Sequence, residues 1–186
     1  MGVSCTGKST LIEKFKNKCK KVDEYIPVKK IKVEKFTNFL LVQHNHHKNH
    51  IWKSGSNYEL KQIVSKEYSC NSNVLLEVDI APRPDFFIKK DFIHWLIDRY
   101  ETKIFHLIAN RGILDDRAKK RNMLWDKKRT ERKTLKHINE MNNLLNNNKI
   151  KKYVTTLPNV SETDFKNNLD TLDAFMTLQI HQSLVL

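Results

Sequence analysis

Apolar residues along this chain recur at two spacings, one typical of helices and one typical of buried strands. The helical spacing occurs over residues 9–19, 58–68, 89–100, 114–145 and from Ser161 through Met176. In the first of these segments Leu11, Ile12 and Phe15 share one face, which predicts a helix that packs against a core. The last segment opens with Ser161 and Asp164, which have the spacing of a capping box.

Short apolar runs predict the strands. They cover residues 73–79, 103–109 and 153–157, and the first of them is typical of a buried parallel strand. Residues 22–27 are predicted to be a loop or a short strand that ends at Pro27, and residues 36–42 fit either a helix or a strand. Because strands and helices alternate, we expect one α/β domain over residues 1–186, with a parallel sheet covered by helices on both faces.

The first residues contain a phosphate-binding motif. Residues 2–9 read G-x-x-x-x-G-K-S and lead into the first predicted helix, whose N-terminal dipole favours bound phosphate. Lys8 is expected to reach the β- and γ-phosphates of a nucleotide, and the Ser9 hydroxyl to bind Mg²⁺. The nucleotide-binding residues are predicted to be Gly2, Ser4, Cys5, Thr6, Gly7, Lys8, Ser9 and Thr10. Such a loop normally follows a buried strand, so we expect that first strand to be missing here.

Two further groups of residues fit phosphoryl transfer. Asp79 ends the strand over residues 73–79, where an acid can bind Mg²⁺ or accept a proton from an attacking hydroxyl. Glu77 competes for this role, but strand alternation favours Asp79. In the loop beyond, Arg83 is a candidate to hold the substrate. Arg117 and Arg121 lie one helical turn apart and can converge on a phosphate.

Charge and composition narrow the class of protein. The net charge is +13, and the basic excess falls in residues 1–53 and 111–153, which favours a site for nucleotides or a nucleic acid. No apolar run is long enough to span a membrane, and the three cysteines show no metal-binding spacing. These features predict a cytoplasmic protein with no membrane partner.

On the residues quoted above, the chain resembles the P-loop kinases of nucleosides and nucleoside monophosphates, such as thymidylate kinases and deoxynucleoside kinases. The matches are residues 2–10, the strand ending at Asp79 with Arg83 beyond it, and the pair Arg117 and Arg121. The resemblance implies a three-layer P-loop NTPase fold and a basic lid over about residues 111–134 that closes over ATP. It also implies Mg²⁺-dependent transfer of the γ-phosphate of ATP to a nucleoside or nucleoside monophosphate.

Two alternatives remain open at this point. A P-loop kinase of this kind can act on another small metabolite or on the end of a polynucleotide. The chain can also be a truncated, inactive kinase-like protein that binds nucleic acid through its basic segments.

Overall fold

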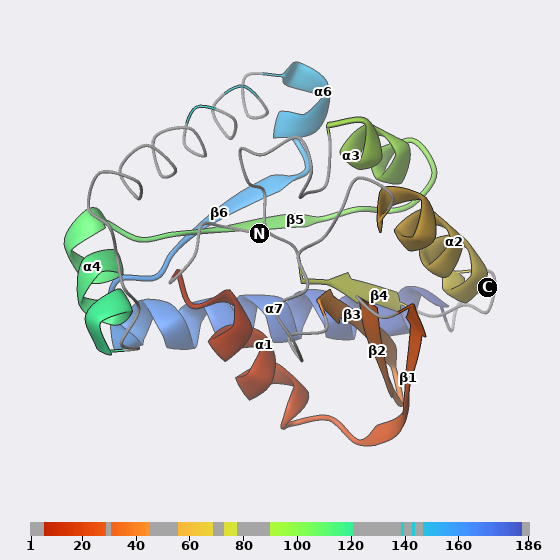
Figure 1. Ribbon diagram of the computed structural model, residues 1–186, viewed down its shortest axis with the longest axis horizontal. Coiled ribbons are helices and arrows are strands. Elements are labelled where there is room, and N and C mark those ends of the chain that lie inside the picture. The colour runs from red at the N-terminus through yellow and green to blue at the C-terminus, as the bar shows by residue number, and fades with distance from the viewer. Residues whose placement is uncertain are drawn as a thin grey trace.

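The computed structural model describes residues 6–28, 31–44, 56–68, 73–77, 90–120, 139, 143 and 147–183. Figure 1 shows the order of the elements along the chain. They are α1 (Lys8–Lys16), β1 (Lys21–Val28), β2 (Ile31–Phe36), β3 (Phe39–His44), α2 (Ser56–Tyr68), β4 (Asn73–Leu76), α3 (Lys90–Ile97), β5 (Ile104–Ile108), α4 (Arg111–Lys120), α6 (Asn148–Lys151), β6 (Val154–Pro158) and α7 (Glu162–Ser183).

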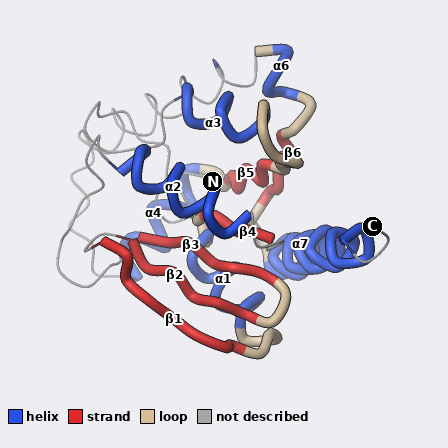
Figure 2. Tube along the Cα trace, turned by 90° about the vertical axis from the view of Figure 1, so that its right-hand side faces the viewer, coloured by secondary structure: helices blue, strands red, loops and turns tan. Residues whose placement is uncertain are grey.

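The strands form two separate sheets among the described residues. The larger sheet has the order β1-β2-β3-β4, in which β1–β2 and β2–β3 pair antiparallel and only β3–β4 pair parallel (Figure 2). The smaller sheet consists of the parallel pair β5–β6. The prediction of a three-layer P-loop NTPase fold with one parallel sheet is therefore wrong.

The physical reason for the difference lies in residues 21–44. Only Thr37 and Asn38 separate β2 from β3, and so short a connection can join strands only in the antiparallel sense. Residues 22–27, predicted to be a loop or a short strand, belong to β1, which pairs with β2 across another short connection. The apolar stretch over residues 36–42 supplies the end of β2 and most of β3.

Helices cover both faces of the larger sheet. On β3, Phe39 and Leu41 point toward α1 and α7, where they pack with Phe15 and Leu172. Leu40 and Val42, which alternate with them, pack on the opposite face against α2 and α3. This alternation places two hydrophobic layers on the sheet, and Leu41 and Val42 are both almost fully buried.

The smaller sheet packs against helices from different parts of the chain. Ile104 of β5 packs against α3 and against Ile150 of α6. Leu107 of β5 packs instead with Leu11 of α1 and Leu157 of β6. Helix α1 therefore contacts both sheets.

Most of the predicted helices and strands are present in the described residues. The predicted capping box is confirmed, since the Ser161 hydroxyl accepts a hydrogen bond from the Asp164 N–H at 3.0 Å and the Asp164 carboxylate accepts one from the Ser161 N–H at 3.0 Å. The predicted helical region over residues 114–145 begins as α4, and most of its remainder lies outside the described residues. None of the described helices has the length and apolar character needed to cross a membrane.

Candidate functional site

The N-terminal end of α1 is shaped by Gly7. Gly7 adopts the left-handed conformation, with φ of 94°, and its carbonyl accepts the hydrogen bond from the Leu11 N–H at 2.9 Å that begins the helix. The N–H groups of Lys8, Ser9 and Thr10 form the first turn and point out of this end of the helix. Together with the helix dipole, they favour an anionic group at this position.

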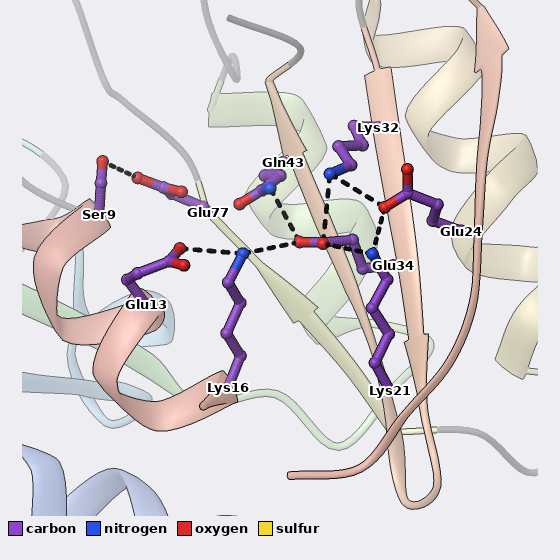
Figure 3. A network of polar contacts seen from close by, with 9 residues as sticks. All are labelled: Ser9, Glu13, Lys16, Lys21, Glu24, Lys32, Glu34, Gln43 and Glu77. Carbon is purple, nitrogen blue, oxygen red and sulfur yellow. Dashed lines mark hydrogen bonds and ion pairs between the residues drawn. The ribbon is translucent and has the colours of Figure 1, made fainter. Parts of the chain in front are cut away.

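A carboxylate from the larger sheet lies at the same end of α1. The Ser9 hydroxyl donates a hydrogen bond of 2.5 Å to the carboxylate of Glu77, and Figure 3 shows this pair next to the first turn of the helix. Glu77 directly follows β4, and its N–H donates to the carbonyl of Val42 at 3.0 Å, which fixes the Glu77 backbone beside β3. Ser9 and Glu77 thus bring two oxygen ligands together.

The position of Glu77 differs from the sequence argument, which favoured Asp79 for this role. Because β4 ends at Leu76, strand alternation does not decide the direction in which Glu77 points. Asp79 lies outside the described residues.

Two side chains converge on the backbone just before Gly7. The Asn159 amide donates a hydrogen bond of 2.6 Å to the carbonyl of Thr6, and Arg117 of α4 donates one of 3.3 Å to the same oxygen. A Cβ atom on Gly7 would collide with the Asn159 amide nitrogen. The loop is thus packed against both α4 and the end of β6.

Arg117 was predicted from the sequence as a site residue, whereas Asn159 was not. The available signal was its position, since Asn159 follows the last strand at its carboxyl end, where parallel sheets place ligand-binding residues. Of the predicted site residues, the structure describes Thr6, Gly7, Lys8, Ser9, Thr10 and Arg117. Gly2, Ser4, Cys5, Asp79, Arg83 and Arg121 lie outside the described residues.

A buried carboxylate ties α1 to the larger sheet. Glu34 of β2 is only 3% exposed, and it accepts a hydrogen bond from Lys16 of α1 at 3.1 Å. Lys32 and the Gln43 amide also donate to it, at 3.2 and 3.1 Å, and Lys21 pairs with it at 3.2 Å (Figure 3). Glu34 therefore anchors the helix whose first turn carries Ser9.

The charges in this cluster stabilise one another. Burial of the Glu34 carboxylate acts to raise its pKa, but the hydrogen bonds from Lys16, Lys21 and Lys32 outweigh burial and hold the pKa below its ordinary value. Partial burial acts to lower the pKa of Lys16, and its hydrogen bonds to Glu13 and Glu34 raise it above the ordinary value. Both groups are therefore charged at neutral pH.

The oxygen pair of Ser9 and Glu77 suits Mg²⁺. Within the ranges that the structure describes, no three His, Cys, Asp or Glu side chains gather as a metal site. Mg²⁺ at a phosphate site commonly takes only one or two protein oxygens and completes its shell with phosphate oxygens and water. The hydroxyl of Ser9 and the carboxylate of Glu77 are hard oxygen ligands of that kind.

No protein-family model, curated protein or solved structure matches this chain.

Proposed function

We propose that this protein transfers the γ-phosphate of ATP to a nucleoside or a nucleoside monophosphate. The observation that carries the proposal is the Ser9–Glu77 oxygen pair at the first turn of α1, directly beside Lys8. A phosphoryl-transfer site needs a cradle of N–H groups, a cation beside it and oxygen ligands for Mg²⁺. The residues from Gly7 to Ser9, together with Glu77, can supply all three.

Each of these residues has a distinct role in the proposed reaction. The N–H groups of the first turn and the Lys8 ammonium hold the β- and γ-phosphates, while Ser9 and Glu77 hold Mg²⁺. When bound, Mg²⁺ neutralises charge on the phosphate oxygens. Arg117 lies close enough to the loop to support the transferred group, since it already contacts the Thr6 carbonyl.

The proposed transfer exchanges one oxygen–phosphorus bond for another. The acceptor oxygen, a hydroxyl oxygen of a nucleoside or a phosphate oxygen of a nucleoside monophosphate, forms a bond to the γ-phosphorus. The bond from that phosphorus to the β–γ bridging oxygen breaks, and ADP leaves with the electron pair. A nucleoside hydroxyl must also lose its proton. The hydroxyl proton passes to a carboxylate, for which Asp79 stays the predicted acceptor.

The first test removes the cation beside the cradle. In Lys8→Ala we expect ATP turnover to fall at least about 100-fold while the protein stays folded, because the side chain stabilises charge on the phosphates. Lys14→Ala is the matched control, since Lys14 is an exposed lysine of the same helix. Turnover that is unchanged in Lys8→Ala, or equally reduced in both variants, contradicts the proposal.

A second test addresses the metal ligands. Glu77→Gln should raise the Mg²⁺ concentration needed for half-maximal turnover about 10-fold or more, because an amide oxygen binds a hard cation less strongly than a carboxylate does. Glu13→Gln removes a carboxylate elsewhere on α1 and serves as the control. An unchanged Mg²⁺ requirement in Glu77→Gln would exclude this carboxylate from the metal site.

The acceptor is identified by a panel of substrates. Nucleosides, nucleoside monophosphates, sugars and an oligonucleotide with a 5′-hydroxyl end are each incubated with ATP and Mg²⁺, and ADP release is measured. Turnover with only the sugars or the oligonucleotide replaces the proposed acceptor with one of the other predicted classes. Salt-sensitive nucleic-acid binding without ATP turnover supports the non-catalytic alternative.

A further inference from the structure

Asn159 is a buried polar residue that takes no direct part in the proposed phosphate binding or catalysis. Its side chain is only 1% exposed, and its N–H donates to the carbonyl of Ile108 at 2.8 Å, which fixes it between the ends of β5 and β6. Its amide nitrogen donates to the Thr6 carbonyl at 2.6 Å. Its amide oxygen is buried, with no hydrogen-bond partner in the described part of the chain. Burying an amide in this way is costly, so the side chain is held here at some expense of stability.

The Thr6 carbonyl belongs to the same rigid peptide unit as the Gly7 N–H. In a trans peptide the carbonyl and the N–H point in opposite directions, so holding the carbonyl also sets the direction of the N–H. The structure has no cis peptide bond among its described residues. The hydrogen bond from Asn159 therefore turns the Gly7 N–H away from Asn159.

We propose that Asn159 is a positioning residue that holds the Thr6–Gly7 peptide in one orientation, so that the phosphate loop is preformed before a nucleotide arrives. The proposal rests on the phosphate-binding role proposed above for this loop. Gly7 is part of the same arrangement, because any side chain there would meet the Asn159 amide. A preformed cradle gains affinity because less conformational freedom is lost on binding.

Arg117 shares the same carbonyl at a longer distance, 3.3 Å against 2.6 Å for Asn159. A carbonyl oxygen has two lone pairs and can accept both hydrogen bonds at once. The guanidinium of Arg117 can turn toward a bound phosphate while Asn159 alone keeps the peptide in place. In the proposed arrangement Asn159 holds the peptide, and Arg117 is the donor that a bound nucleotide can recruit.

The chain offers a matched control for Asn159. Asn168 of α7 is also buried, at 3% exposure, and its amide donates to a backbone carbonyl, that of Pro158, at 2.7 Å. Asn159→Ala and Asn168→Ala therefore each remove one buried amide from the same end of β6, but only the first acts on the loop.

The test compares three measurements on both variants. They are the free energy of unfolding, amide hydrogen exchange of Leu11 without nucleotide, and the dissociation constant of Mg·ATP. The Leu11 N–H donates to the Gly7 carbonyl at 2.9 Å, so its exchange reports whether the loop holds its place at the start of α1. We expect Asn159→Ala to speed exchange about 10-fold and to weaken Mg·ATP binding about 10-fold, whereas Asn168→Ala changes both by less than about twofold at a similar loss of stability. Parallel changes in the two variants, or unchanged exchange in Asn159→Ala, overturn the proposal.

The exchange measurement separates this proposal from the function on which it rests. If the wild-type protein shows no Mg·ATP binding, the proposed function fails, while the exchange of Leu11 still decides whether Asn159 holds the loop. Should Asn159→Ala not fold, the isosteric Asn159→Asp replaces it. At pH 7 its carboxylate cannot donate to the Thr6 carbonyl, so the Leu11 amide should exchange faster than in the wild-type protein. Unchanged Leu11 exchange in Asn159→Asp contradicts the proposal.

Discussion

Removing the charge of Glu34 should release α1 from the larger sheet without changing the shape of the core. In Glu34→Gln, the side chain keeps its size, but the ion pairs with Lys16, Lys21 and Lys32 are lost. Because Lys16 extends from α1, the change weakens the connection between this helix and β2. We expect both the free energy of unfolding and the order of the first turn of α1 to decrease.

The magnitude follows from the exposure of the partners. The Glu34 side chain is 4% exposed, and those of Lys16 and Lys32 are 16% and 24% exposed, so two of the three ion pairs are partly shielded from water. Hydrogen bonds to a buried charged group are worth roughly 1.5–3 kcal/mol each, but the Lys21 side chain is 42% exposed and contributes little. The cost of burying the carboxylate offsets part of the gain. We therefore expect Glu34→Gln to lower the free energy of unfolding by about 2 kcal/mol.

The loss of stability should depend on pH in a defined direction. The pKa of Glu34 lies below its ordinary value of 4.5, so its contribution is fully present above pH 4.5 and is lost as the pH falls through the lowered pKa. The difference between the wild-type protein and Glu34→Gln should consequently be constant from about pH 6 to 8 and shrink below about pH 4. Urea denaturation at a series of pH values measures it.

The control is Glu24→Gln. Glu24 also pairs with Lys21 and Lys32, but its side chain is 50% exposed, so we expect no change in the urea midpoint beyond experimental error. Equal stability of Glu34→Gln and the wild-type protein at pH 7, or an equal loss in both variants, would refute the reasoning.

Two further predictions concern the loop and the core. Gly7→Ala should abolish Mg·ATP binding and lower Tm, because the left-handed backbone disfavours alanine and the added Cβ collides with Asn159. Gly112→Ala in α4 is the control, since a Cβ added there has no neighbour closer than 3.6 Å and should be tolerated. Leu41→Ala, at a fully buried position of β3, should cost about 3 kcal/mol in urea denaturation. Val22→Ala removes a side chain that is 60% exposed and should cost no more than about 0.5 kcal/mol. Binding retained in Gly7→Ala, or similar losses at Leu41 and Val22, would contradict these expectations.

The sequence predicted the positions of α1, α2, α3 and α7 from the helical spacing of their apolar residues, and those of β4, β5 and β6 from short apolar runs. It did not predict the antiparallel arrangement of β1, β2 and β3. In β2 the alternation that begins with Ile31 and Val33 stops at Lys35, and the next apolar residue, Phe36, packs on the opposite face of the sheet. Glu34 is buried although its position in the pattern is a polar one, so no apolar residue marks the second buried face there. The edge strand β1 is largely exposed and carries charged residues, which gives it no apolar face to recognise.

The candidate site was predictable only where a single local motif defines it. Residues Gly7 to Ser9 follow from the phosphate-binding pattern, whose spacing is set by backbone geometry. For the acid beside the loop, the sequence favoured Asp79 over Glu77 by extending strand alternation past Leu76, where β4 ends. Asp79 lies outside the described residues, so its role stays a prediction. Asn159 acts on the carbonyl of Thr6, a residue 153 positions away, and no periodic signal in a single sequence reports such a contact.

The three antiparallel strands also bear on the order in which the molecule assembles. Strands β1, β2 and β3 are joined by short connections, so their contacts close small loops and are expected to form early in folding. The contacts around the first turn of α1 instead join residues separated by 68, 111 and 153 positions. High contact order of this kind is entropically costly, so the loop should become ordered last and open first under mild denaturant. We therefore expect the meander of β1 to β3 to form before the contacts around α1, and the hydrogen bonds of Ser9 and Thr6 to form in the final step of folding.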